Sequence, residues 1–179
     1  DEWKPLGGKR AVVEDHFNEL VIDLVNPAGQ PERMQLVVRG YNDGFAFCYK
    51  IPDGKGPCVN VQSELTAYNF AGDYTAWFYN GENHNIGPEK LTETDGTRLP
   101  VMTVKAGDKH YMAIHEACLE TGAPLVLQSK GGESLFSVAS KPTSLSPGYT
   151  SAWRVVLYGT TPGVLTDSHL LELLNPDPD

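Results

Sequence analysis

The first residue with recognisable chemistry is a single glutamate near the end of an apolar run. Glu116 follows His115 and the segment His110–Ile114, whose alternating pattern is typical of a β-strand. A carboxylate in this position could bind a hard cation such as calcium, which prefers oxygen donors. One carboxylate does not make a metal site, because calcium takes about six to eight oxygen ligands. From residue chemistry alone, a solvated surface glutamate is the competing interpretation.

A second candidate is the aromatic segment Tyr68–Glu93, which ends in a polar stretch rich in glycine and asparagine. The pattern predicts a long irregular loop, and such loops in compact domains tend to be functional or disordered. The rings argue against disorder, because their apolar area has to be covered. Tyr74 and Trp77 could stack on the apolar face of a sugar ring. Alternatively, they pack at the end of the domain or dock on a neighbouring domain, which predicts that Trp77 is incompletely buried.

The other reactive side chains form no recognisable catalytic pattern. Glycoside hydrolysis needs two carboxyl groups about 5 to 10 Å apart, and nothing selects a pair among the 23 Asp and Glu residues. Asp15 and His16 could enter a catalytic triad, but the nucleophile motif G-x-S-x-G is missing. The three cysteines form no CxxC pair, which argues against zinc. We expect free, buried thiols, with a Cys48–Cys58 disulfide as the alternative.

Composition excludes several classes of function. The net charge is −9, and the 14 Lys and Arg residues are scattered, so the basic patch that nucleic-acid binding requires is not expected. No stretch reaches the roughly 20 apolar residues of a membrane helix. The first residues, Asp1–Pro5, lack the basic and then apolar order of a signal peptide. At 179 residues the chain fits one domain with a substantial core.

The elements that would position these residues are short strands, because the hydrophobic period is mostly two. The segment Met34–Ile51 contains two apolar runs separated by Asn-Asp-Gly, which is a strong hairpin signal. Phe45, Phe47 and Tyr49 should share one face of its second arm. Other predicted elements are a strand in Glu19–Val25, hairpins in Val101–Ile114 and Pro124–Ala139, a strand in Trp153–Tyr158, a turn at Thr161–Gly163, and a short helix or strand in Ser168–Leu174.

This pattern of short strands and closely spaced turns predicts an all-β domain with little helix, built as a sandwich or barrel. Five segments, taken in order, add a more specific indication. They are Gly40–Phe47, Glu64–Trp77, Ala113–Ala117, Ala152–Val156 and Leu170–Pro176. In this order they resemble the N-terminal domain of glycoside hydrolase family 97, a family of bacterial α-glucosidases and α-galactosidases. The likeness runs from about Trp3 to Pro176, so residues 1–176 are interpreted as that domain and 177–179 as the start of a linker.

The resemblance implies a β-super-sandwich similar to galactose mutarotase, packed against a catalytic (β/α)₈ barrel in the same polypeptide. The catalytic residues would belong to the barrel, so none is expected here. Glu116 matches the one calcium ligand that the N-terminal domain contributes. Several strands that usually precede Asp1 would be missing, which would leave a sheet edge open to pairing. We also expect Glu116 to be solvent-accessible, or held only by a local hydrogen bond, and not to be paired with a buried arginine.

The function expected from this resemblance is that of an accessory domain of a calcium-dependent α-glycosidase that hydrolyses terminal α-linked glucose or galactose. An oligosaccharide would be the substrate of the parent enzyme, and the periplasm or cell envelope of a bacterium its location. The competing hypothesis is a stand-alone carbohydrate-binding module. A third interpretation, an independent hydrolase, requires this chain to turn over α-glycosides by itself.

Overall fold

The structure, a computed structural model, describes residues 2–5, 8–27, 33–82, 85–120 and 122–176. The interpretation of residues 177–179 as a linker therefore lies outside the described residues. Strands make up most of the fold, which confirms the all-β prediction. They are β1 Glu2–Trp3, β2 Val13–Glu14, β3 Asn18–Val25, β4 Arg33–Tyr41, β5 Gly44–Lys50, β6 Val59–Val61, β7 Ala67–Asn69, β8 Thr75–Tyr79, β9 Asn85–Lys90, β10 Asp95–Lys105, β11 Tyr111–Ala117, β12 Leu127–Lys130, β13 Leu135–Val138, β14 Thr143–Leu145 and β15 Trp153–Gly159.

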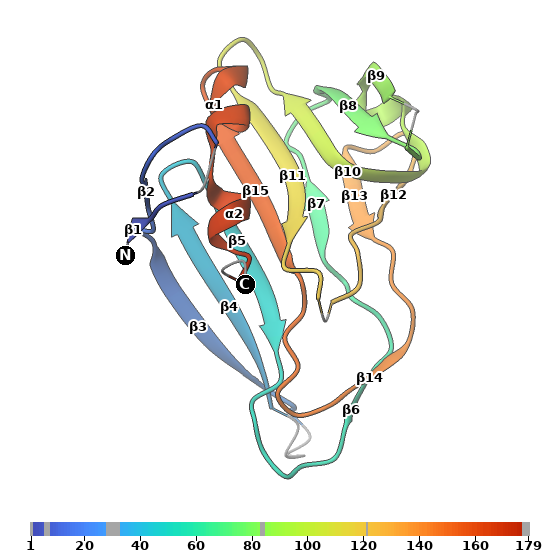
Figure 1. The fold of residues 1–179 in the computed structure, drawn as a ribbon. Coiled ribbons are helices and arrows are strands. Elements are labelled where there is room, and N and C mark those ends of the chain that lie inside the picture. The colour runs from blue at the N-terminus through green and yellow to red at the C-terminus, as the bar shows by residue number, and fades with distance from the viewer. Residues whose placement is uncertain (1, 6–7, 28–32, 83–84, 121, 177–179) are drawn as a thin grey trace.

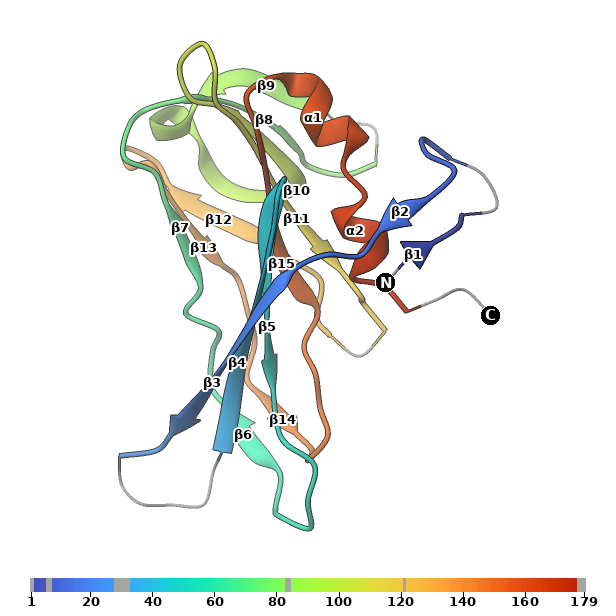
Figure 2. The same cartoon turned by 90° about the vertical axis from the view of Figure 1, so that its left-hand side faces the viewer.

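Eleven of these strands form one antiparallel sheet that folds over to make two layers (Figures 1 and 2). Its order is β3-β4-β5-β15-β11-β10-β12-β13-β7, and β8 pairs with both β10 and β9. The long strand β10 takes part in both layers. Its beginning, Asp95–Arg98, pairs with β12, whereas its end, Met102–Lys105, pairs with β11. One strand therefore connects the two halves of the sandwich.

The hairpin of β4 and β5 confirms the prediction made from Asn-Asp-Gly. Its register runs from Gln35↔Lys50 to Tyr41↔Gly44. Within β5, the small side chains of Ala46 and Cys48 are buried, and the aromatic side chains on the other face stay partly or fully exposed. Phe45, for example, is 44% exposed. Alternation predicted which residues share a face, while the second layer determines how far each face is covered.

The main core lies between the two layers. Its fully buried members include Phe78 of β8, Met102 and Val104 of β10, and Phe136 of β13. Tyr68, Phe70 and Tyr74 pack around its margin. The inner faces of both layers thus meet in an apolar contact, as expected for a sandwich.

A second cluster occupies the outer face of β15 and β11, beneath two short helices. These are α1, Pro162–Asp167, and α2, Leu170–Leu173. Buried Trp153 and Val155 of β15 pack there with Leu170. At the predicted turn, Thr161–Gly163, the chain leaves β15 and enters α1: Thr161 is the N-cap, Pro162 opens the helix, and the N–H of Val164 donates to the carbonyl oxygen of Thr161 at 3.3 Å. Proline is suited to the first helical turn, where its missing N–H has no partner to lose.

The aromatic segment also differs from its prediction. Instead of one irregular loop, residues 68–93 include the end of β7, the hairpin strands β8 and β9, and a 3₁₀ turn, Leu91–Glu93. In β8 the alternation is clear: Ala76 and Phe78 are buried, whereas Trp77 and Tyr79 are exposed. The polar composition of the turn after Tyr79 favours a loop in the sequence pattern, although β8 itself has the period of two that is typical of a strand.

Candidate functional site

Glu116 lies on the inner face of β11, where it stands directly opposite Arg154 of β15. Its side chain is only 10% exposed. One carboxylate oxygen, Oε2, accepts a short hydrogen bond from the backbone N–H of Leu125. Glu116 is therefore not the solvent-accessible carboxylate of the first expectation. The alternative, a carboxylate held by a local hydrogen bond, is found in the contact with Leu125, but Leu125 is not its only charged or polar neighbour.

Arg154 is the centre of a buried charge network. Its side chain is 3% exposed, and its Nε and Nη2 atoms donate to the two carboxylate oxygens of Glu64 at 3.1 and 2.7 Å. Nη1 donates to the carbonyl oxygen of Ala123 at 3.3 Å and lies 3.9 Å from Oε2 of Glu116. The bidentate Glu64 contact is the primary ion pair, and Glu116 is a secondary neighbour.

The expectation that Glu116 is not paired with a buried arginine is therefore also wrong. The physical reason is the register of β11 and β15, which sets the two side chains opposite each other on the inner face. Sequence reasoning gave Arg154 no role. An arginine within the apolar run Trp153–Tyr158 signals a buried cation that needs a partner. That partner, Glu64, is 90 residues away and could not be inferred locally.

Burial and charge act in opposite directions on these groups. Burial raises the pKa of Glu116, while the Leu125 N–H and the Arg154 guanidinium act to lower it. Burial alone would lower the pKa of Arg154, but the Glu64 carboxylate outweighs this effect and raises it. Arg154 thus remains charged, and Glu116 is a partly desolvated carboxyl group within its field.

Glu116 could supply one ligand to a calcium ion, but the described residues around it do not form a calcium site. Among the described residues, no group of three or more His, Cys, Asp or Glu side chains is placed to hold a metal ion. Calcium takes about six to eight oxygens, and the nearest charge to Glu116 is a cation at 3.9 Å. A complete calcium site would need most of its oxygens from residues other than those described.

Tyr74 and Trp77 do not form one surface. Tyr74 precedes β8 and packs against the main core, in an edge contact with Phe70 at 6.5 Å between ring centroids. Trp77 points to the opposite side of β8, with 36% of its surface exposed beside Tyr79 at 39%. The incomplete burial predicted for Trp77 is confirmed, and the role of Tyr74 and Trp77 in sugar contact or domain docking stays a prediction.

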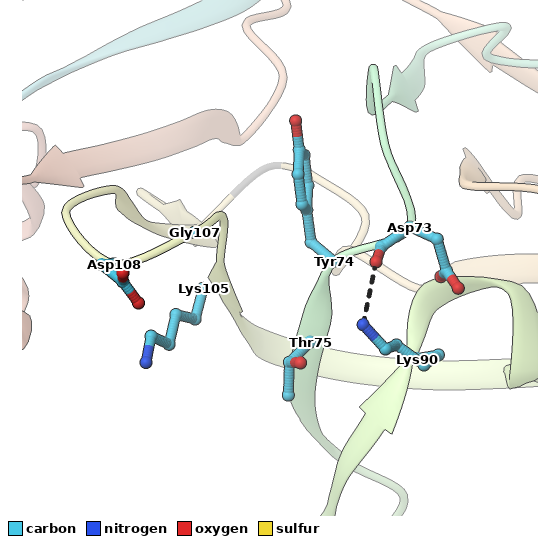
Figure 3. Close-up of a pocket in the computed structure, with 7 residues that line it drawn as sticks. All are labelled: Asp73, Tyr74, Thr75, Lys90, Lys105, Gly107 and Asp108. Atoms are coloured by element: carbon cyan, nitrogen blue, oxygen red, sulfur yellow. Dashed lines mark hydrogen bonds between the residues drawn. The ribbon is translucent and has the colours of Figure 1, made fainter.

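A shallow pocket of about 250 Å³ opens beside Tyr74 (Figure 3). It is lined by Asp73, Tyr74, Thr75, Lys90, Lys105, Gly107 and Asp108. Several of its polar groups already have partners in the protein. Lys90 Nζ donates to the carbonyl oxygen of Asp73 at 3.2 Å, and the Asp73 carboxylate accepts from the backbone and hydroxyl of Thr92. These bonds stabilise the turn and engage the side chains of Lys90 and Asp73.

The three cysteines are free thiols, which excludes the alternative Cys48–Cys58 disulfide in this structure. Cys48 is buried, and burial raises the pKa of its thiol to about 11. Cys118 is half-buried. Cys58 is exposed, so the expectation of burial is wrong at that position, which lies outside the strands in the loop before β6.

Comparison with known proteins assigns this chain to a family. The model of the glycosyl hydrolase 97 N-terminal family matches residues 1–176. A retaining alpha-galactosidase of Bacteroides thetaiotaomicron is 27% identical over 160 residues, which are 79% of this chain and 23% of that protein. The chain belongs to the glycosyl hydrolase 97 N-terminal family, as its five sequence motifs predicted.

Solved structures show the same fold. A glycoside hydrolase family 97 enzyme from Pseudoalteromonas sp. strain K8, in complex with acarbose, matches with a TM-score of 0.83 at 23% identity. The match covers 98% of this chain and 28% of that one. A beta-arabinopyranosidase matches with a TM-score of 0.75 at 17% identity, over 89% of this chain and 30% of its own. This chain therefore spans less than a third of the relatives that it matches.

Proposed function

We propose that this chain is the accessory N-terminal domain of an α-glycosidase that hydrolyses terminal α-linked glucose or galactose. The observation that supports this most strongly is the family match over residues 1–176, with relatives whose chains are several times longer. The retaining alpha-galactosidase relative gives the class of reaction. In this proposal the domain packs against a catalytic barrel of the same polypeptide, and the barrel supplies the catalytic residues.

Trp77 and Tyr79 are the proposed contact with that barrel. They are neighbouring aromatic side chains on the exposed face of β8, 36% and 39% accessible. Gly87 in β9 lies against Trp77: a Cβ atom at Gly87 would stand 3.0 Å from Cδ1 of the indole. The absence of a side chain at Gly87 therefore lets the indole of Trp77 lie close to β9.

Glu116 is proposed as the one ligand that this domain gives to a calcium ion, completed by oxygens of the barrel. Its remaining 10% exposure leaves a route for contact, and the Leu125 N–H fixes the orientation of its carboxylate. A bound calcium ion would supply a fixed positive charge that orients nearby oxygen groups. Arg154 would hold Glu64 and limit the movement of Glu116.

In the complete enzyme, Glu116→Gln should weaken calcium binding at least tenfold and lower kcat/KM, because an amide oxygen is a weaker ligand than a carboxylate. Calcium titration by isothermal calorimetry measures the first effect independently of activity. In the isolated domain the same substitution should cost about 1 kcal/mol, since the Leu125 N–H keeps an acceptor. Glu82→Gln, on the turn after β8, is the control and should change neither quantity.

A loss of several kcal/mol in the isolated domain, with unchanged calcium affinity in the enzyme, would show that Glu116 is purely structural. The proposed function has a separate test. The remainder of the polypeptide, produced without residues 1–176, should be poorly active, and adding this domain should restore activity. Full activity of the remainder alone would rule out an accessory role for this domain.

The competing function, a stand-alone carbohydrate-binding module, is tested by sugar titration. We expect no saturable heat when glucose, galactose or maltose is added to this chain up to low-millimolar concentration. The reason is that Tyr74 packs against the main core, whereas Trp77 lies on the exposed face of β8. Saturable binding that Tyr74→Ala abolishes would favour the binding module. Turnover of a chromogenic α-glycoside by the chain would favour the independent hydrolase.

The cellular location is part of the same proposal. The matched relatives include a bacterial glycosidase, which supports a bacterial origin, and we propose that the enzyme acts on oligosaccharides in the periplasm or cell envelope. Among the residues that the structure describes, neither helix has the length and apolar character that crossing a bilayer requires. Fractionation of a producing bacterium, followed by detection with an antibody to this domain, tests the location.

A further inference from the structure

The hairpin of β8 and β9 lies at one end of the molecule, and its turn begins with Asn80–Gly81 (Figure 1). This is the only Asn-Gly pair in the sequence. Asn80 is exposed, and neither its side chain nor the Gly81 N–H forms a hydrogen bond to the part of the chain that the structure describes. Gly81 has a φ of 111°, and a Cβ atom built on it would meet nothing within 4 Å. The side-chain amide of Asn80 and the nitrogen of Gly81 therefore have room to approach each other.

A similar dipeptide, Asp43–Gly44 in the β4–β5 hairpin, lies in a closed environment. Gly44 pairs with Tyr41 across the hairpin, and the N–H of Tyr158 donates to the carbonyl oxygen of Asp43 at 2.8 Å. Gly44 also lies so close to the backbone of Val156 that a Cβ atom on it would overlap the carbonyl oxygen. The two turns therefore differ mainly in how tightly the surrounding protein holds their backbone.

We propose that Asn80 is a site of spontaneous deamidation. The backbone nitrogen of Gly81 attacks the carboxamide carbon of the Asn80 side chain. The new C–N bond closes a succinimide ring, the bond to the side-chain nitrogen breaks, and ammonia leaves with the proton from Gly81. Water, the only co-reactant, then adds to either ring carbonyl and opens the ring to aspartate or isoaspartate. Asparagine is chemically labile, and glycine adopts backbone conformations that other residues disfavour.

The reaction changes both the charge and the backbone at the end of β8. Either product carries a carboxyl group, which is ionised at neutral pH. Each conversion therefore makes the net charge of the chain, which is −9, more negative by one. Isoaspartate also adds a carbon atom to the main chain directly after Tyr79. Under the proposed function the new charge would lie next to the barrel contact, and only this consequence rests on that proposal.

Asp43→Asn in the 179-residue chain provides a matched test, because it creates a second Asn-Gly pair in the closed hairpin. Asn-Gly is favoured in such a turn, so the substitution is compatible with the fold. The chain is incubated at mildly alkaline pH and analysed by peptide mapping with mass spectrometry. The amide should be lost at least about tenfold faster at position 80 than at position 43, a difference of about 1.4 kcal/mol in activation free energy. In urea the two rates should become similar, because the two dipeptides are then identical and equally free.

Two further measurements use the unsubstituted chain and one control variant. Enzymatic methylation of isoaspartate should label the peptide that contains residue 80 in the unsubstituted chain. Ion-exchange chromatography should resolve a more acidic form that accumulates with time. Asn80→Gln should not accumulate this form, because its longer side chain would have to close a larger and less favourable ring.

The proposal is overturned by equal rates of amide loss at positions 80 and 43 in the folded chain, or by an acidic form that Asn80→Gln does not prevent. If Asp43→Asn does not fold, the unsubstituted chain still decides the question. Folding that slows amide loss at Asn80 by about tenfold or more, relative to the chain in urea, overturns the proposal. Because every measurement is made on this chain alone, the outcome does not depend on whether the proposed accessory role is correct.

Discussion

Arg154→Met is expected to destabilise this domain by about 3–5 kcal/mol, because removal of one member of a buried ion pair leaves its partners uncompensated. Glu64 and Glu116, with side chains 17% and 10% exposed, would both lose their cation. Methionine fills much of the volume of arginine. The decrease in the free energy of unfolding therefore reflects the lost charge more than lost packing. Urea unfolding followed by tryptophan fluorescence gives the free energy directly. The total free energy of unfolding of a domain of this size is about 5–15 kcal/mol.

Arg39→Met is the matched control for Arg154→Met. The Arg39–Glu19 pair has a similarly short N–O distance, 2.8 Å against 2.7 Å for Arg154–Glu64, but its side chains are 27% and 37% exposed. An exposed pair contributes about 0–1 kcal/mol, and the contact of Arg39 with the Phe17 ring at 4.3 Å adds about 0.5–1 kcal/mol. If Arg154→Met and Arg39→Met lower the free energy of unfolding by the same amount, burial does not determine how much the Arg154 network contributes to stability.

Phe136→Ala should cost a similar amount, about 3–5 kcal/mol, through a different cause. Phe136 is fully buried between the layers and contacts Phe78 at 5.6 Å and Phe70 at 6.4 Å between ring centroids. Alanine would leave a cavity that the surrounding strands cannot close without moving β13. Phe136→Leu should cost less, on the order of 1–2 kcal/mol, since it fills more of that space. Both values come from urea unfolding.

Phe45→Ala provides the comparison for Phe136→Ala, because Phe45 is a strand residue that is 44% exposed. Its loss should be about 1 kcal/mol or less. If Phe136→Ala costs no more than Phe45→Ala, the two layers are not held together by the core around Phe136. An unchanged m-value in each variant would show that the effect belongs to the folded state.

Local patterns in the sequence predicted the strands well, because their causes are local. The Asn-Asp-Gly turn has few alternatives to a hairpin, and alternation assigned the two faces of β5 correctly. The same rule applied to Thr75–Tyr79 would have found β8, where inward and outward residues alternate strictly. The Gly- and Asn-rich stretch after Tyr79 obscured it, because turn composition was interpreted as a property of the whole segment.

The environment of Glu116 could not be predicted in the same way. Its neighbours depend on the register between β11 and β15 and on a segment far earlier in the chain that brings Glu64 to Arg154. No periodicity encodes such a pairing. The family resemblance predicted a calcium-ligand role for Glu116, and that role stays a prediction. Only the folded arrangement shows that its carboxylate is enclosed and near a cation.

The role of β10 in both layers constrains the order in which this chain can assemble. Neither layer is complete until residues 95–105 have paired with β12 at one end and with β11 and β8 at the other. β15 must also arrive from near the C-terminal end of the chain to join β5 with β11. Closing such large loops costs entropy before the contacts compensate for it, and folds rich in non-local pairing are correspondingly slow to form. Hairpins of consecutive strands, such as β4–β5, β10–β11 and β12–β13, can form from local contacts alone, so they are the natural starting points for folding.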